Sequence, residues 1–311
     1  MPKPIVFLGL PGSPIGTDLA TRFGRAASSG HAFHALSLDA PLENKPVTVT
    51  SGAVFWEGVD LLRAGAIFVE RPVFPWPQPQ LPPRKLRGDA AYKLWIVFQR
   101  EANSLVASAI AAAAEVTPVV NAPAAVHVAV SPALALDLLA RQGLRIHPWA
   151  LEPAPLTDRR RNALVIDACG RDRWHSPDLP QPGEFVLVFE AFSEEVVTFL
   201  VVGEKTAGAI RYRGAEAWAR RGEIEEPVCE SDSALSPPGS ESVAAADRLA
   251  RDAAKALDLH LAAVSVRTGP SSPAILLCDA SPDLAAWRKH LGPGLAAVLS
   301  DHLISLASHQ Q

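Results

Sequence analysis

The sequence predicts a mixed α/β protein in which a parallel, doubly wound sheet is followed by antiparallel strands. Short apolar runs alternate with helical patterns early in the chain, as is typical of a parallel sheet. Later apolar runs, joined by the turn 203–205, predict antiparallel pairing. The 311 residues, 48% of them hydrophobic, are enough to bury the core of one large domain or of two domains.

The first third of the chain carries the parallel pattern. Ile5–Gly9 is an apolar run between proline and glycine residues and predicts a buried strand, and Thr17–Ala27 has helical spacing behind a possible Thr17 cap. The stretches Ala53–Arg63 and Ala66–Glu70 are expected to repeat the pattern as a helix and a strand. Arg71–Gly88 holds six prolines, which predicts an extended loop.

The remaining elements follow from the same two periodicities. The helices are expected at Ala90–Glu115, Ser131–Gly143, Val243–Leu257 and Pro293–Ala307, with a closely packed Ala-rich end to the first of them. The strands are expected at Pro118–Asn121, Ala163–Asp167, Leu261–Val266 and Ala274–Asp279. An antiparallel meander is expected from Phe185–Phe192, Val196–Val202 and Thr206–Tyr212, and a loop at Pro227–Ser242.

Composition excludes several classes of protein. With 29 basic against 33 acidic residues and a net charge of −4, the chain lacks the excess of positive charge that nucleic-acid binding needs. Three widely separated cysteines form no disulfide framework or zinc knuckle, which favours a reducing cytoplasm. No window reaches the roughly 20 apolar residues of a membrane span, and the N-terminus has no secretion signal. We therefore expect a cytoplasmic protein without nucleic-acid or membrane partners.

The glycines at 9, 12 and 16 lie where a strand leads into a helix, a place that favours phosphate. The turn lacks the lysine of a phosphate-binding loop and the spacing of a dinucleotide motif, so a structural turn is favoured. Ser13 is not a typical hydrolase nucleophile, because Pro14 has no N–H to donate to an oxyanion.

Three further features each have a structural and a functional interpretation. His31 and His34 have a spacing that metal ligands can adopt, yet no carboxylate or cysteine is near, so a surface turn is favoured. Arg159–Arg161 fits a phosphate contact or a solvated turn. Trp76, in the proline-rich loop, fits a partner contact or, preferably, a contact that fastens the loop to the core.

From Val120 onward, the order of several motifs resembles the ATP-grasp superfamily, especially its glutathione-synthetase and ribosomal-protein glutamate-ligase branch. The motifs are Val120–Pro123, Leu138–Pro148, Phe185–Phe192, Phe199–Gly203 with Ala207–Arg211, and Leu257–Ala286. The resemblance implies a Rossmann-like N-terminal domain (1–118) followed by central (119–182) and C-terminal (183–311) ATP-grasp-like α+β subdomains with antiparallel sheets.

The resemblance also implies a reaction, in which ATP activates a carboxylate as an acyl phosphate that an amine attacks. It implies two lysines on the ATP phosphates, and Asp, Glu and Asn ligands for two magnesium ions. The lysine positions align near Ser131–Pro132 and near Asp167, and no lysine lies between Lys93 and Lys205.

The magnesium positions differ from the family as well. The expected Asp falls on Ser265, the Glu on Leu277 and the Asn on Asp279, so one weak candidate for a metal ligand remains. A lone carboxylate holds Mg²⁺ poorly, because this ion prefers near-octahedral oxygen ligation.

Other residues remain candidates for binding ATP. Arg211 and Arg213 could replace the lysines electrostatically as catalytic cations, and Arg171 and Arg173 could contact the nucleotide. The resemblance implies an adenine hinge at Glu190, Ala191 and Phe192, although the same residues fit a buried strand end. ATP with Mg²⁺ is thus an expected cofactor whose binding is weakened or lost.

These observations favour a pseudoenzyme. It would bind a small ligand, a nucleotide or a protein partner in the cleft between the central and C-terminal subdomains, or through the proline-rich loop near Trp76. The alternative is an active ATP-dependent carboxylate–amine ligase whose phosphate and magnesium groups have moved to other positions. A cofactor-binding protein that uses Gly9–Gly16 is a more distant third hypothesis.

Overall fold

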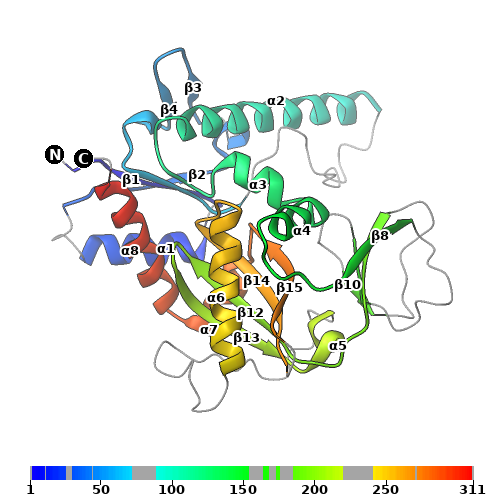
Figure 1. Cartoon of the computed structure of the whole chain (residues 1–311). Coiled ribbons are helices and arrows are strands. Elements are labelled where there is room, and N and C mark those ends of the chain that lie inside the picture. Colours follow the sequence, from blue (N-terminus) through cyan, green and yellow to red (C-terminus); the bar gives the residue numbers. More distant parts are fainter. Residues whose placement is uncertain are drawn as a thin grey trace. The chain divides into compact units, whose positions relative to one another are not determined.

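The computed structural model describes residues 2–10, 12–25, 30–43, 45–71, 89–153, 164–167, 173–175, 185–219, 241–269 and 272–309. The chain divides into two compact units (Figure 1). Unit 1 comprises Met1–Pro123 with Ala296–Gln311, and unit 2 comprises Ala124–Leu295. The three-part division at 118 and 182 is not tested by this partition and stays a prediction. The expected mixed α/β class, with a parallel sheet followed by antiparallel sheets, is confirmed.

The parallel sheet of unit 1 has the strand order β2-β1-β6-β7. Its strands are β1 (Ile5–Gly9), β2 (Phe33–Ser37), β6 (Ala66–Val69) and β7 (Val119–Val120). Ile5 pairs with Phe33 on one side and with Ala66 on the other, so β1 is an interior strand. All five residues of β1 are buried, as the apolar run predicts.

Among its described residues, unit 1 also contains the helices α1 (Pro14–Arg25), α2 (Asp89–Ala114) and most of α8 (Gly294–Ser308). Helix α1 begins three residues before the predicted start, because Pro14 fits the first helical position, where no N–H is needed. Arg22 on α1 forms an ion pair with Asp301 on α8 at 3.0 Å. The second half of α2, from Val106 to Ala113, packs into the core of unit 1.

The helix predicted at Ala53–Arg63 is wrong. This stretch forms β4 (Val54–Trp56), β5 (Val59–Asp60) and the short 3-10 helix η3 (Leu61–Arg63); β4 also pairs with β3 (Val47–Val49), which follows the 3-10 helix η2 (Ala40–Glu43). Glu57 and Gly58 have positive φ angles of 48° and 87°, which a helix excludes and a tight hairpin turn requires.

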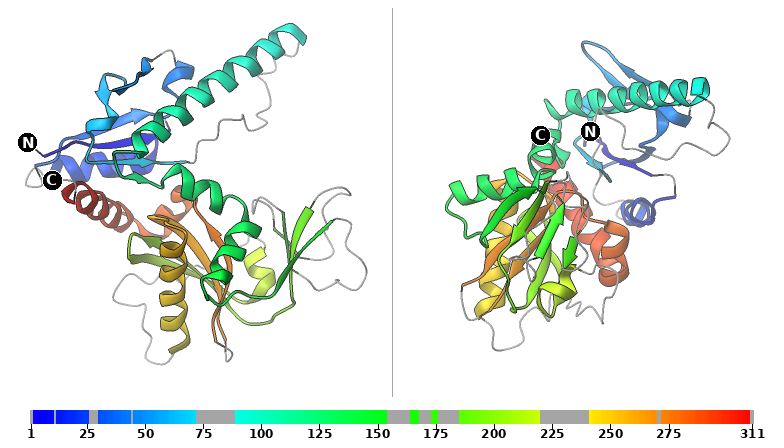
Figure 2. Two further views of the ribbon diagram at one scale, coloured as in Figure 1. Left: turned by 45° about the horizontal axis from the view of Figure 1, so that its top comes forward. Right: turned by 90° about the vertical axis from the view of Figure 1, so that its right-hand side faces the viewer.

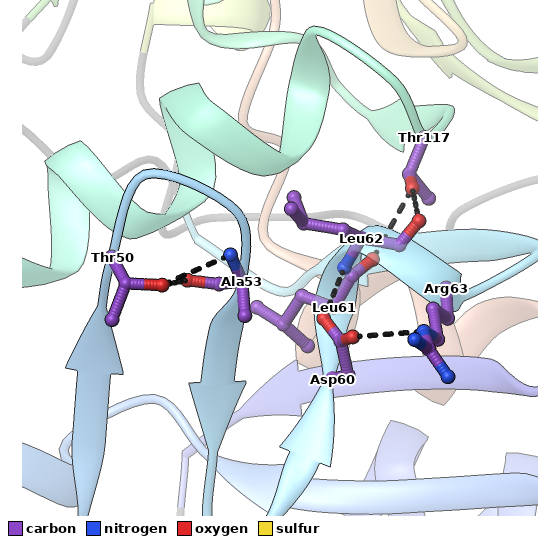
Figure 3. Close-up of polar contacts among 7 residues, drawn as sticks. All are labelled: Thr50, Ala53, Asp60, Leu61, Leu62, Arg63 and Thr117. Atoms are coloured by element: carbon purple, nitrogen blue, oxygen red, sulfur yellow. Dashed lines mark hydrogen bonds and ion pairs between the residues drawn. The ribbon is translucent and has the colours of Figure 1, made fainter.

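Local polar contacts hold this arrangement (Figure 3). The Thr50 hydroxyl accepts from the Ala53 amide at 3.1 Å and closes the β3–β4 turn. The Asp60 carboxylate accepts from the Leu62 amide at 3.1 Å, so it caps η3 and lets a helical turn begin only there. The Thr117 hydroxyl donates to the Leu61 carbonyl at 3.2 Å and ties η3 to the approach to β7.

The described residues of unit 2 form two antiparallel sheets. The first has the order β10-β9-β11-β8, formed by β8 (Trp149–Pro153), β9 (Leu164–Asp167), β10 (Arg173–His175) and β11 (Phe185–Phe189). The second has the order β13-β12-β14-β15, formed by β12 (Val196–Val202), β13 (Lys205–Tyr212), β14 (Leu261–Arg267) and β15 (Ala274–Asp279).

The predicted three-stranded meander is confirmed for two of its strands and wrong for the third. Strands β12 and β13 form the expected hairpin around Gly203. Strand β11 belongs instead to the first sheet, where it pairs with β8 on one side and β9 on the other. Periodicity identifies strands but not their partners, and two strands near in sequence here join different sheets.

The described helices of unit 2 are α4 (Pro132–Arg141), α5 (Gly214–Ala219), α6 (Glu241–Ala256), α7 (Leu284–Leu291) and, from its second residue on, α3 (Pro123–Ala129). Helix α6 lies along one face of the second sheet (Figures 1 and 2). Its buried face is made only of alanines, at 246, 250, 253 and 254, which lets the helix approach the strands closely. Among the described helices, none is long and apolar enough to cross a bilayer by itself; the bent pairs α3–α4 and α7–α8 reach that length and composition only when taken together.

Candidate functional site

The three positions where the resemblance implies magnesium ligands lie together on the second sheet of unit 2. Ser265 on β14 pairs directly with Leu277 on β15. Asp279 is two residues further along β15, and because side chains alternate along a strand, it shares the face of Leu277. On the other side of β14, Thr198 of β12 pairs with Ser265 and extends the same row.

A buried, neutral hydrogen-bonded cluster occupies this row. The Ser265 hydroxyl lies 2.8 Å from the Thr198 hydroxyl, and the Trp218 indole N–H donates to it at 3.1 Å. Ser265 is 1% exposed and Trp218 is fully buried. Trp218 comes from α5, which contacts strands of both sheets of unit 2. The polar groups of Ser265 are thus satisfied by the protein itself.

The residues present do not fit the magnesium pair that the resemblance implies. Ser265 and Leu277 supply no carboxylate, and Leu277 is buried. Asp279 Oδ1 accepts from the Ser281 amide at 2.9 Å in the turn after β15. In the part of the chain that the structure describes, no group of three or more His, Cys, Asp or Glu side chains could hold a metal ion.

Glu190, Ala191 and Phe192, where the resemblance implies an adenine hinge, directly follow β11. Glu190 and Ala191 are exposed, and Phe192 is half-buried. His147 Nε2 lies 2.9 Å from the Glu190 carbonyl oxygen, and its ring contacts the rings of Phe189 and Phe192. Because a carbonyl only accepts, Nε2 carries the proton. One lone pair of the Glu190 carbonyl is therefore used by an internal donor.

His147 is 3% exposed, and burial lowers its pKa, against the opposing effect of the hydrogen bond to the Glu190 carbonyl. Its Nδ1 atom is buried without a hydrogen-bond partner among the described residues, so a proton there would be poorly solvated. The backbone amide of His147 donates to the Ile275 carbonyl at 2.9 Å. His147 thus connects the end of β11 with β15 as a neutral imidazole.

We expect His147 to make stability depend on pH. Its pKa is lowered in the folded state, so stability is full above about pH 6.5 and falls at lower pH, where the unfolded chain takes up the proton. His147→Gln keeps an N–H for the Glu190 carbonyl and should reduce the loss of stability between pH 7.5 and pH 5.5, measured by urea unfolding. His260 and His290, whose pKa values burial also lowers, remain in both proteins. Equal losses in both proteins would contradict the assignment.

The arginine candidates do not gather at one place. Arg211 is on β13, with its Nε 3.8 Å from Glu195 Oε2, and Arg213 is exposed just after that strand. Arg211 and Asp279 lie on opposite edge strands with β12 and β14 between them, a separation of about 14 Å at normal strand spacing. Arg173 is in β10, whereas Arg171, Arg159–Arg161 and Trp76 lie outside the described residues.

In the glycine-rich turn of unit 1, side chains of the protein itself occupy the space beside the backbone. A Cβ at Gly9 would lie 2.1 Å from Phe7 Cε1, and a Cβ at Gly16 would lie 2.5 Å from the same atom. The Glu70 carboxylate accepts from the Leu10 amide at 2.7 Å and from the Ser13 hydroxyl. The glycines therefore make room for an aromatic ring, and a carboxylate already lies at the start of α1, where a phosphate would bind.

The histidine pair also has ordinary roles. His31 Nδ1 lies 2.8 Å from the Lys3 carbonyl oxygen. His34 is part of β2, where it pairs with Val6. Neither belongs to a metal-binding group among the described side chains. The structure thus supports structural interpretations for the glycine turn and for the histidine pair.

Sequence reasoning missed Trp218, Thr198, His147 and Glu70 as the residues that fill or fasten these places. Trp218 follows Gly214, whose φ of +90° leads into the short helix α5. A tryptophan just after a predicted hairpin was the available signal, because such a large side chain needs a partner for its N–H when buried. Its partner, Ser265, is 47 residues away, and no local pattern links the two.

Comparison with known proteins finds no match to a family model and none to a curated protein. Solved structures do match over nearly the whole chain. The ATP-grasp ligase PsnB, complexed with a phosphomimetic variant of its minimal precursor, Mg and ADP, matches with a TM-score of 0.70 and 17% identity, over 98% of each chain.

Two further structures have the same architecture. The macrocyclase MdnC from Microcystis aeruginosa MRC, bound with the precursor peptide MdnA, matches with a TM-score of 0.65 and 10% identity, over 97% of this chain and 99% of the other. A RimK domain ATP-grasp protein from Sphaerobacter thermophilus DSM 20745 matches with a TM-score of 0.55 and 14% identity, over 96% and 98%. The chain therefore has the fold of the ATP-grasp ligases.

Proposed function

We propose that this protein uses the ATP-grasp fold to bind a peptide or protein partner and does not carry out the ligase reaction. The observation that carries the proposal concerns two of the positions implied for magnesium ligands: Ser265 is buried in hydrogen bonds with Thr198 and Trp218, and its strand partner is the apolar Leu277.

Phosphoryl transfer needs cations, because negative charge spreads over the phosphate oxygens in the transition state. The cluster offers no ligand charge to magnesium, and no lysine lies between Lys93 and Lys205. Arg211 faces Glu195 at 3.8 Å and lies on the edge strand opposite Asp279. These placements support a loss of the ligase reaction together with loss or weakening of Mg·ATP binding.

The class of partner is suggested by the solved structures. PsnB and MdnC are seen with precursor peptides, so the fold accommodates a peptide in those proteins. A peptide is therefore our preferred ligand for this chain. The proline-rich loop near Trp76 remains a predicted contact for a partner.

The proposal is tested with nucleotide. At 5 mM Mg·ATP we expect no ADP release above a protein-free blank across a panel of carboxylates, amines and peptides. We also expect no rise in melting temperature, whereas a ligand at 100 times its Kd would add about 2.7 kcal/mol to the free energy of unfolding. Coupled ADP detection and differential scanning fluorimetry measure these two quantities.

The active-ligase alternative makes the opposite prediction. Mg²⁺-dependent ADP release that is lost in Asp279→Ala or Glu190→Ala would contradict the loss of the reaction. The binding part is tested separately, by selecting a displayed library of random peptides on the immobilised protein and measuring the enriched peptides by fluorescence anisotropy. A set of related sequences with a saturable Kd is expected, and the absence of any enriched sequence would contradict peptide binding.

A further inference from the structure

Strand β8 forms a free edge of the first sheet of unit 2. It pairs with β11 on one side, and no other described strand pairs with it. The Glu190 amide donates to the Pro148 carbonyl at 3.2 Å, and the register continues from there without a shift. Because hydrogen-bonded pairs alternate along an antiparallel ladder, every second residue of β8 from Pro148 bonds toward β11. The backbone groups of Trp149 and Leu151 therefore point away from β11 and have no strand partner among the described residues.

The side chains of these two residues belong to an apolar strip. Side chains alternate along a strand, so Trp149, Leu151 and Pro153 lie on one face. Leu151 is 48% exposed, the highest value for a large apolar side chain on the edge strands whose side chains the structure describes. Trp149 is half-buried and Pro153 is exposed. Exposed apolar side chains beside unpaired backbone groups form a surface that a further strand completes.

The other edges of the two sheets of unit 2 are short, charged or covered. Strand β10, at the far side of the first sheet, has three residues. Strand β13 carries Lys205 and Arg211 and has a register shift in its pairing with β12. Strand β15 is covered at Ile275, whose amide donates to the Arg145 carbonyl at 2.9 Å. Such devices keep an edge from pairing with another chain, and among the described residues none of them blocks the middle of β8.

The backbone of β8 indicates which class of molecule completes it. Trp149 and Leu151 present two donors and two acceptors in alternation, and an extended main chain offers the complementary series at the same spacing. An antiparallel strand would exchange two hydrogen bonds with each of these residues. Glu152 is the one charged residue of β8, so a lysine or arginine opposite it is favoured.

We propose that the edge of β8 is a docking site for an extended peptide, which joins the first sheet of unit 2 as an antiparallel strand. Read from its N-terminus, the peptide places a basic residue opposite Glu152 and an apolar residue opposite Leu151. The next residue lies opposite Ala150, and a second apolar residue lies opposite Trp149. This inference rests on the proposed function, since it gives the peptide ligand a place and a chemical pattern.

A designed peptide tests the strand pairing. Fluorescence anisotropy with the full chain and labelled Thr-Lys-Val-Thr-Val-Thr should give a Kd on the order of 100 μM. N-methylation of either valine removes an N–H that donates to β8 and should raise the Kd at least about tenfold. The threonine between the valines has its N–H turned away from β8, so its N-methylation is the matched control and should change the Kd less than about twofold. Equal weakening by all three would overturn the pairing.

Protein variants test the place and the register. Leu151→Lys puts a charge on the free edge and should raise the Kd at least about tenfold. The matched control is Leu134→Lys, at an exposed leucine on α4, which should leave the Kd unchanged. Glu152→Lys should weaken binding of the lysine peptide several-fold and should bind Thr-Glu-Val-Thr-Val-Thr within about twofold of the original Kd. Circular dichroism and melting temperature confirm folding.

The outcomes separate this site from the proposed function. Library-selected peptides that lose binding in Leu151→Lys but keep it in Leu134→Lys would support the site. Selected peptides that bind both variants equally would support peptide binding and overturn the site on β8. No saturable binding of the lysine peptide up to about 2 mM would also overturn the site. A dimer of the chain that Leu151→Lys abolishes would assign the edge to a second copy and overturn a peptide as its occupant.

Discussion

Replacing Trp218 with alanine is expected to lower the free energy of unfolding by about 3–5 kcal/mol. The indole is fully buried, and its N–H donates to the Ser265 hydroxyl at 3.1 Å. The substitution removes the largest side chain of α5 and leaves a cavity against β14. Urea unfolding followed by circular dichroism measures the loss.

Trp218→Phe separates volume from hydrogen bonding. Phenylalanine keeps most of the apolar volume but cannot donate, so we expect a loss of about 1–2 kcal/mol. Ser265 keeps its contact with Thr198 in this variant. A small loss in Trp218→Ala, below about 1 kcal/mol, would contradict a packed cluster and would favour an open site at these positions.

The motif order of the ATP-grasp resemblance predicted where the magnesium-ligand positions lie, even though the residues at these positions differ from the family's. Ser265, Leu277 and Asp279 were placed by motif order alone, and the structure puts them side by side on one face of the sheet. Strand positions could be predicted because each apolar run is itself the local signal. That Trp218 would fill the site was not predictable, since this contact joins elements far apart in sequence.

The predicted helix at Ala53–Arg63 failed for a different physical reason. Apolar residues at 54, 56, 59 and 61 fit either a helix or short strands, and a window this short does not decide between them. The deciding features are Gly58, in a left-handed conformation, and Asp60, which starts a helical turn only at Leu61. In this stretch the turn-forming and capping residues, and not the spacing of the apolar residues, determine the secondary structure.

The glycine turn offers a prediction in which two alanine variants of one helix change stability in opposite directions. Gly24→Ala, at an exposed position of α1 with open space around it, should raise the free energy of unfolding by about 0.5–1 kcal/mol. Gly16→Ala should lower it by about 1–3 kcal/mol, because the new Cβ would lie 2.5 Å from Phe7 Cε1. Urea unfolding of both variants, with Gly24→Ala as the matched control, measures the difference.

The direction of the Gly16→Ala effect distinguishes the two interpretations of the turn. Phe7 is buried, with its ring centroid 5.5 Å from that of Phe68, so the ring has little room to move. In a Phe7→Leu background the Gly16→Ala loss should shrink, since the clashing ring edge is gone. If Gly16→Ala instead stabilises the protein as Gly24→Ala does, the ring gives way easily. The glycine at position 16 would then not be required by the Phe7 ring, and the structural interpretation of the turn would lose this support.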